Sequence, residues 1–300
     1  MVICDWLDVT HSIDDTPLSE VRLLLLSWDA EAAGPDFFRV GDGGAVKLEK
    51  RGAFTRVSLS GGAVSWLRST GNWLSMLGLL ASSPHRVTRL DAAYDVPVDG
   101  ADVIAAMRRR FRSGEVRLGR KALKTTCLLA VRPDGRETGT WYAGHRSNAR
   151  ATARVYDKAW ERLQKAGVAV PPCTRYEVTV KKDYGATLRD AAEPERLFWH
   201  VAAPALLEAP EGVPGWDAGW AEGWVLKRPE VMPAAVLEAR VSRSAELAVL
   251  LEAADALGPA GRVFLARRVL RRLGVTAEGL EATGGKGVAT DDTGLVSDAR

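Results

Sequence analysis

The sequence has 300 residues, of which 46% are hydrophobic and 26% charged, and a net charge of +3, the composition of a globular chain with one large core or two ordinary ones. Its apolar runs are shorter than the ~20 residues that cross a bilayer, and Asp5 and Asp8 stand where a signal peptide is basic, so we expect a cytoplasmic protein with no membrane partner. Residues 101–160 contain 14 Lys and Arg but only 5 Asp and Glu. This basic middle region is typical of a surface that binds polyphosphate, although a solvated Arg-rich helix face gives the same pattern.

Alternating apolar and polar residues predict a series of β-strands. They lie at residues 2–10, 46–50, 53–60, 86–96, 126–131, 138–143, 151–157 and 174–182. Helical patterns cover about Pro17 to Ala33, Ala63 to Ala81 and Ala101 to Arg112, and Asp134-Gly135 indicates a hairpin turn. This order predicts an α+β fold, mainly an antiparallel sheet with helices on one face, built from two similar β-α-β-β halves.

Composition divides the chain into four parts. Residues 1–200 contain the predicted sheet and the candidate catalytic residues. Residues 201–233 are rich in Pro, Gly and Trp and are interpreted as a connecting segment, and residues 234–280 form a helical C-terminal region with a break at Gly258-Pro259. Residues 281–300 have too few apolar side chains to offset the entropy of ordering, so we expect a disordered tail.

One face of the predicted sheet combines carboxylates, a tyrosine and several cations. Within residues 89–95, alternation places Arg89, Asp91 and Asp95 on the same face. The other strands add Asp8 and Thr10, then Thr152, Arg154, Tyr156 and Lys158, then Arg175, Glu177, Thr179 and Lys181. The solvated face of an ordinary antiparallel sheet, with cross-strand ion pairs, has the same pattern.

These residue types also suit phosphate chemistry. Gathered carboxylates bind Mg²⁺ or Mn²⁺, and flanking cations suit a phosphate that such an ion polarises. Asp91 and Asp95 are roughly 13 Å apart on a regular strand, so we expect one of them to bind the ion together with Glu177, with Asp8 or water completing the shell. Tyr156 is the candidate nucleophile. The four histidines form no His-x-His pair or HExxH motif, and no P-loop or serine-hydrolase elbow is present.

Five segments, in this order, resemble the trans-acting replication initiation factors of rolling-circle plasmids and filamentous phages. They are Asp-Trp-Leu-Asp-Val-Thr (5–10), Arg-Leu-Asp-Ala-Ala-Tyr-Asp (89–95), Trp-Tyr-Ala-Gly-His-Arg-Ser (141–147), Ala-Arg-Val-Tyr-Asp-Lys-Ala-Trp-Glu-Arg (153–162) and Arg-Tyr-Glu-Val (175–178). The resemblance spans about residues 3–200. It implies a DNA-nicking domain that cuts and joins origin DNA through a covalent 5′-phosphotyrosine and leaves a 3′-OH primer.

The resemblance also implies residue roles. Tyr156 would attack the phosphodiester, with Arg154 and Lys158 around the scissile phosphate. The acidic residues that match the family's ion ligands are Asp91, Asp95 and Glu177, and the strand pattern adds Asp8. Origin DNA, single-stranded or cruciform, would meet the basic residues Arg146, Arg150, Arg108, Arg109, Arg110, Arg120, Lys121 and Lys124. Members of the family act as homodimers and recruit a host helicase, and a host polymerase extends the primer.

Several alternatives remain open at this point. Tyr142 is the rival nucleophile, His145 is a candidate proton shuttle, and Arg150 also fits a plain loop charge. The alternative function is a noncatalytic, sequence-specific DNA-binding protein, such as a phage or plasmid regulator. A tyrosine recombinase would require a largely helical catalytic domain and no metal.

Overall fold

The computed structural model describes residues 1–114, 125–144, 149–203, 206–217, 219–229, 245–256 and 258–272. The chain divides into two units, Met1–Met232 and Pro233–Arg300. In the second unit the described residues form two helices, α9 (Ala245–Ala256) and α10 (Gly258–Arg272), in the region where a helical pattern was predicted. The tail predicted at 281–300 lies outside the described residues.

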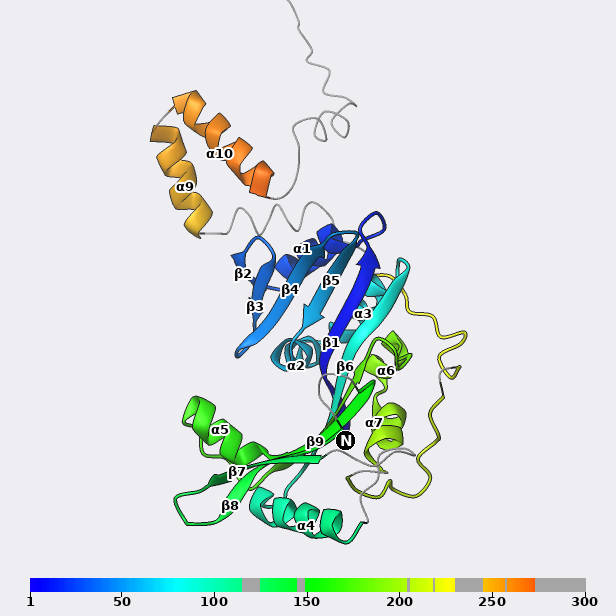
Figure 1. The fold of residues 1–300 in the computed structure, drawn as a ribbon. Helices are drawn as coiled ribbons and strands as arrows, with labels where there is room; N and C mark the ends of the chain where they lie inside the picture. The colour runs from blue at the N-terminus through cyan, green and yellow to red at the C-terminus, as the bar shows by residue number, and fades with distance from the viewer. Residues whose placement is uncertain are drawn as a thin grey trace, which may run out of the picture. The chain divides into compact units, whose positions relative to one another are not determined.

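The first unit is built on one ten-stranded antiparallel sheet (Figure 1). The strands are β1 (Val2–Ser12), β2 (Glu31–Gly34), β3 (Phe37–Val40), β4 (Gly44–Arg51), β5 (Phe54–Leu59), β6 (His85–Val96), β7 (Thr125–Val131), β8 (Glu137–Ala143), β9 (Ala151–Asp157) and β10 (Thr174–Lys181). Their order across the sheet is β2-β3-β4-β5-β1-β6-β10-β9-β8-β7. The α+β class and the antiparallel sheet are therefore confirmed.

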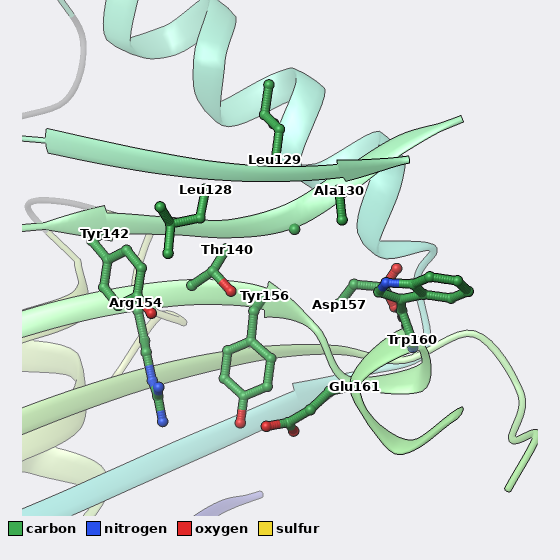
Figure 2. Close-up of a pocket in the computed structure, with 11 residues that line it drawn as sticks. Leu128, Leu129, Ala130, Thr140, Tyr142, Arg154, Tyr156, Asp157, Trp160 and Glu161 are labelled. Atoms are coloured by element: carbon green, nitrogen blue, oxygen red, sulfur yellow. Dashed lines mark hydrogen bonds between the residues drawn. The ribbon is translucent and has the colours of Figure 1, made fainter. Parts of the chain in front are cut away.

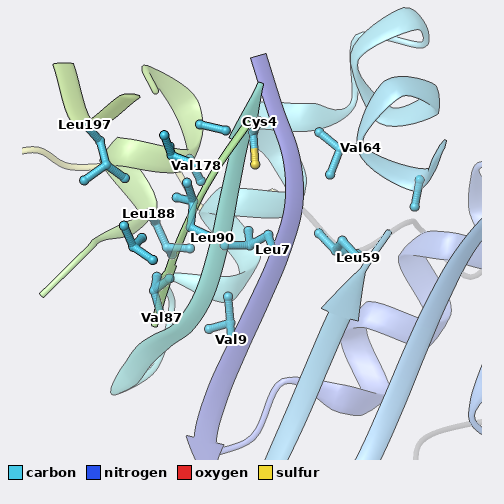
Figure 3. Packing of buried hydrophobic residues seen from close by; sticks show 14 of the residues in the cluster. Cys4, Leu7, Val9, Leu59, Val64, Val87, Leu90, Val178, Leu188 and Leu197 are labelled. Carbon is cyan, nitrogen blue, oxygen red and sulfur yellow. The ribbon is translucent and has the colours of Figure 1, made fainter. Parts of the chain in front are cut away.

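One face of the sheet packs against helices and forms the hydrophobic core. The helices that bury apolar side chains there are α1 (Leu18–Ser27), α2 (Gly61–Ser69), α3 (Trp73–Leu80), α4 (Gly100–Arg112), α6 (Leu188–Ala192) and α7 (Glu195–Ala202). Alternate strand residues such as Leu7, Leu90 and Val178 are fully buried among them (Figure 3). Helix α5 (Lys158–Ala166) has no fully buried residue and continues directly from β9. The opposite face of the sheet, which we call the polar face, carries the chemistry described below.

The sheet consists of two halves with the same topology. The first runs β1-α1-β2-β3-β4-β5 and the second runs β6-α4-β7-β8-β9-β10. In each half the last strand pairs with the first, and β1 pairs with β6 at the centre. The predicted duplication is therefore present, but each half has five strands rather than the three of a β-α-β-β unit. The alternation pattern predicted all five strands of the second half and missed β2 and β3 in the first.

Two of the predicted helices were too long. The helix expected from Pro17 to Ala33 ends at Ser27, since Asp29 adopts a left-handed backbone with φ 66° that an α-helix cannot continue, and residues 31–34 form strand β2. The helix expected from Ala63 to Ala81 is two helices, α2 and α3, because Gly71 has φ 74° between them.

The segment predicted as a connection at 201–233 packs on the sheet unit where it is described. The indole N–H groups of Trp216 and Trp220 both donate to Oδ1 of the buried Asp190, at 2.7 and 2.9 Å. Aromatic side chains and one shared carboxylate thus fix this segment to the start of α6. Within the described residues, no helix combines the length and the hydrophobicity that a membrane span requires.

Candidate active site

The polar face brings together the ionisable residues that alternation predicted for β6, β9 and β10, which are neighbours in the sheet. Arg154 stands opposite Glu177, and Thr179 stands opposite Asp91. Their burial is unlike that of a solvated sheet face, because Asp91 is 3% exposed and Glu177 is 1% exposed. Charged groups with so little solvent require partners, and arginines supply them.

Tyr156 lies at the centre of this group. Its hydroxyl donates to Oε2 of Glu177 across 3.3 Å. The guanidinium of Arg154 lies 4.9 Å from the centre of its ring, and the ammonium of Lys158 lies 5.5 Å from it. Burial, and then the charge of Glu177, raise the pKa of Tyr156 far above its usual value. The phenol is therefore neutral here and needs a proton acceptor before it can act as a nucleophile.

Glu177 is the group closest to that role. Its Oε1 accepts a hydrogen bond from Arg154 Nη2 at 2.5 Å, so its two oxygens contact different partners. Burial raises the pKa of Glu177 to about 7, although Arg154 acts in the opposite direction, and the charges of Asp91 and Asp5 add to the rise. A carboxyl that titrates near neutral pH can take or release a proton under physiological conditions.

Asp91 and Asp5 complete the acidic cluster. Arg89 donates to both oxygens of Asp91, with 2.9 Å between Nε and Oδ1, while burial raises the pKa of Asp91. Asp5 is the extra residue of a β-bulge, because Cys4 pairs with Ala92 and Trp6 pairs with Asp91. Asp5 was not predicted as a site residue. The signal was the spacing of three residues between the core positions of Cys4 and Leu7, which breaks strict alternation.

The four predicted metal ligands do not all meet. Asp95 binds Arg175 through two hydrogen bonds of 2.6 and 2.7 Å. Asp8 accepts hydrogen bonds from Ser58 and from Trp6 Nε1. Asp91 and Glu177 do influence each other, because the charge of Asp91 adds to the rise in the pKa of Glu177.

The Asp91 and Glu177 pair is compatible with a hard divalent ion. In the part of the chain that the structure describes, no three His, Cys, Asp or Glu residues are grouped so as to hold a metal. Mg²⁺, however, commonly takes one or two carboxylates and completes its shell with water and substrate phosphate oxygens. Two buried carboxylates with raised pKa values fit that requirement, because a cation between them would offset their mutual repulsion.

A cavity of about 310 Å³ opens beside Tyr156 (Figure 2). We call it the Tyr156 cavity. Strands β7, β8 and β9 and the start of α5 form its walls, and its lining includes Leu128, Thr140, Tyr142, Arg154, Tyr156 and Trp160. Tyr142, the rival nucleophile, stands opposite Arg154 in the β8–β9 ladder. Both tyrosines therefore line the same cavity, and the hydroxyl of Tyr156 contacts the carboxylate of Glu177.

A buried ionic network fixes the start of α5 next to Tyr156. The side chain of Asp157 accepts a hydrogen bond from the backbone N–H of Trp160 at 2.9 Å, which caps the helix. The other carboxylate oxygen of Asp157 accepts from Arg132 Nε at 3.0 Å and from Thr138. Arg132 also donates to Asp99, the residue that caps α4. One arginine from the end of β7 thus links the caps of two helices.

Four of the eight predicted DNA-binding residues lie in the described part of the chain, Arg150 in a loop and the other three on α4. Arg150 is exposed just before β9. Helix α4 packs on the core side of β8, where Arg108 binds Glu137 at 2.6 Å, Arg110 donates to the carbonyl oxygen of Leu206 and Arg109 is exposed. The other predicted residues, together with His145, lie outside the described residues; they are Arg120, Lys121, Lys124 and Arg146.

No family model and no curated protein matches the chain. The chain is similar in structure to a rolling circle replication initiator protein from Geobacillus stearothermophilus, with 16% identity, a TM-score of 0.49 and coverage of 76% of this chain and 92% of that one. It is also similar to DynU16, a protein of the dynemicin biosynthetic locus, with 14% identity, a TM-score of 0.19 and coverage of 65% and 94%. Similarities of this degree do not establish a function.

Proposed function

We propose that this protein is a rolling-circle replication initiator that nicks and rejoins origin DNA with Tyr156 as the nucleophile. The observation that carries the proposal is the 3.3 Å contact between the Tyr156 hydroxyl and Glu177, beside an open cavity and with two cations near the tyrosine ring. A tyrosine with a proton acceptor and adjacent positive charge has the groups that phosphodiester transfer requires. A tyrosine recombinase is disfavoured, because the described site lies on a sheet rather than in a helical domain.

The reaction follows from these contacts. The Tyr156 oxygen forms a bond to the scissile phosphorus while the bond between phosphorus and the 3′ oxygen breaks. The phenol proton passes to Glu177, and the departing 3′ oxygen takes a proton from solvent to become the 3′-OH primer. The 5′ phosphate stays on Tyr156, and attack by a 3′-OH on this phosphotyrosine rejoins the strand. Arg154 and Lys158 stabilise the negative charge that develops on the phosphate oxygens.

A divalent ion is part of the proposal. Asp91 and Glu177 would hold Mg²⁺ or Mn²⁺, which when bound supplies polarisation of the phosphate oxygens. Asp95 and Asp8 would join as further ligands only if they left Arg175 and Ser58, their present partners.

The wider partners are proposed from charge and from the sequence resemblance. Single-stranded or cruciform origin DNA would reach Tyr156 past the exposed Arg150, with Arg146, Arg120, Lys121 and Lys124 adding backbone contacts. Arg109 would serve duplex DNA on the other side of the sheet. Homodimerisation, recruitment of a host helicase and extension of the primer by a host polymerase would take place in the cytoplasm.

One observation favours a second candidate, a noncatalytic sequence-specific DNA-binding protein. Each buried carboxylate of the site already has an arginine partner, as in the pairs of Asp91 with Arg89 and Glu177 with Arg154. The pKa of Tyr156 is also raised rather than lowered. A polar face stabilised in this way needs no chemistry to explain it.

A covalent-trapping experiment separates the two candidates. Purified protein is incubated with labelled single-stranded DNA carrying its replication origin and with Mg²⁺ or Mn²⁺, and is then run on denaturing gels. We expect a protein–DNA adduct from the native chain and from Tyr142→Phe, and none from Tyr156→Phe. Adduct formation by Tyr156→Phe would refute the assignment of the nucleophile, and its absence from the native chain with either ion would favour the noncatalytic candidate.

A further inference from the structure

The Tyr156 cavity contains more than the transfer of a phosphoryl group requires. A nucleophile needs only access to a phosphate, yet this space extends from Tyr156 to the indole of Trp160 on α5 and to Leu128 on the edge strand β7. Two tyrosines, a tryptophan and apolar side chains line it. Aromatic walls of this kind suit a flat, partly apolar group, and the charged side chains of Arg154, Asp157 and Glu161 also line the space.

We propose that the Tyr156 cavity binds one unstacked nucleobase of a single-stranded DNA substrate, adjacent to the phosphate that Tyr156 attacks. The proposal deepens the proposed function and rests on it for the identity of the substrate. Single-stranded nucleic acid is held in this way elsewhere, by aromatic side chains on which a base stacks and by cations along the backbone. The ligand of the Tyr156 cavity is therefore a base that is no longer stacked on its neighbours.

The position of Trp160 supports a stacking role. The residue is half-buried and lines the cavity. Its backbone N–H is bound by Asp157, and Arg132 holds Asp157 in turn. The indole is thus presented by a helix start that the buried network keeps in place, which lowers the conformational entropy lost on binding.

The edges of the cavity are polar, as recognition of a base requires. Thr140 contributes a hydroxyl group, and Glu161 contributes a carboxylate that binds Lys158 and Lys165 at 2.6 Å each. Such groups can pair with the ring nitrogens and exocyclic groups of a base. The apolar and aromatic walls would then supply affinity, and the polar edge would supply discrimination between bases.

The cations are placed for the phosphate that accompanies the base. Arg154 lines the Tyr156 cavity and also a second, smaller cavity of about 60 Å³ that reaches Arg89 and Glu177. Lys158 approaches the ring of Tyr156 from the start of α5. A nucleotide whose base enters the larger cavity would bring its phosphate towards Arg154 and the Tyr156 hydroxyl, so the base pocket would also position the scissile bond.

The test uses binding alone, with EDTA present so that no strand is cut. Fluorescence anisotropy gives the Kd for a short oligothymidine and for an abasic oligonucleotide with the same number of phosphates. We expect the native chain to prefer the oligothymidine, and Trp160→Ala to weaken that complex about tenfold while leaving the abasic complex unchanged. Trp160→Phe keeps an aromatic face and should retain most of the preference, which guards against a mere folding defect.

A matched control is Phe54→Ala, since Phe54 is an aromatic residue, 59% exposed, on a strand of the first half. It should leave both dissociation constants unchanged. The proposal is overturned if Trp160→Ala weakens both complexes equally or neither. Tyr156→Phe should keep the preference for the oligothymidine. If the cavity selects bases but the native chain forms no adduct, only the proposed enzymatic function is disproved. If the native chain forms an adduct but its preference for bases does not depend on Trp160, only the proposed base-binding role of the cavity is disproved.

Discussion

The hydroxyl of Tyr156 and the carboxylate of Glu177 meet across strands β9 and β10 with 3.3 Å between oxygen atoms. Each group is nearly excluded from solvent, and this burial, followed by the negative charge of Glu177, raises the pKa of Tyr156. The pair therefore favours a state with the phenol proton in place and an acceptor adjacent to it. Glu177, with a pKa of about 7, is the group whose protonation would control the pair near neutral pH.

The first prediction concerns stability against pH. The pKa of Glu177 rises from 4.5 in the unfolded chain to about 7 in the fold. The folded state thus binds this proton more tightly, and its free energy of unfolding should fall as the pH rises from about 4.5 to about 7. Glu177→Gln cannot titrate, so the Tm advantage of the native chain over this variant should be larger at pH 5 than at pH 8.

Glu49→Gln is the matched control for this measurement. Arg56 and Arg51 lower the pKa of Glu49 below 4.5 against the opposing effect of burial, so any stability it contributes is lost only at more acidic pH. The Tm difference between this variant and the native chain should be the same at pH 5 and pH 8. A constant difference for Glu177→Gln as well would contradict the raised pKa.

The second prediction concerns the divalent ion. A ligand that binds only the folded state raises the Tm. At a hundredfold excess over its Kd, the ligand adds about 2.7 kcal/mol to the free energy of unfolding. Mn²⁺ or Mg²⁺ at pH 7.5 should stabilise the native chain, and Asp91→Asn and Glu177→Gln should each abolish the shift. Asp95→Asn and Asp8→Asn should retain it, because these carboxylates bind Arg175 and Ser58. Loss of the shift in all four variants would mean that the ligand set is larger than the pair.

Much of the polar face could be predicted because alternation is a local property. The assignment of Tyr156 and Glu177 to one face requires only that each strand be regular, and β9 and β10 pair without a register shift. Asp5 was not predicted as a site residue because its strand is irregular: a bulge on β1 turns Asp5 towards Arg175. The ion-pair partner of each carboxylate could not be predicted either, because the sequence pattern allows Arg175 to bind Asp5, Asp95 or DNA equally well.

The relationship between the halves shows the same limit. At the centre of the sheet β1 pairs Leu7 with Leu90 of β6, so Asp8 and Asp91 occupy equivalent positions in the two halves. In the first half, Arg56 of β5 pairs with Glu49 of β4. At the equivalent place in the second half, Glu177 of β10 pairs with Arg154 of β9. The cross-strand ion pair is thus present in both halves with its signs exchanged. At this pair, charge reversal preserves the pairing but removes the residue identity, so comparison of the two segments of sequence does not reveal the equivalence.

The third prediction concerns the path of the DNA. If single-stranded DNA approaches Tyr156 along the polar face, Arg150→Ala should weaken binding and make the dependence of log K on log salt concentration shallower by about 0.7, the value for one lost phosphate contact. Arg109→Ala removes an exposed arginine from α4, on the core side of the sheet, and should leave single-strand affinity unchanged. Filter binding at several salt concentrations measures both, and equal effects of the two variants would rule out a path confined to the polar face.

The fourth prediction concerns the network that holds α5. Asp157 is 2% exposed, and its Oδ2 accepts hydrogen bonds from Arg132 and Thr138. Arg132→Met would leave this carboxylate without its cation, so we expect the free energy of unfolding in urea to fall by on the order of 2 kcal/mol. Trp160-dependent binding of oligothymidine should weaken with it, because the same carboxylate caps α5.

Arg136→Met provides the comparison that makes this prediction specific. Arg136 also binds Asp99, together with Asp102, but its side chain is 42% exposed, against 15% for Arg132. Water can replace Arg136 at these carboxylates, since exposed ion pairs contribute little to stability. The urea midpoint and the preference for oligothymidine should therefore stay close to those of the native chain. Equal losses in both variants would show that the surface pairs, rather than the buried contact of Arg132 with Asp157, hold the start of α5 beside Tyr156.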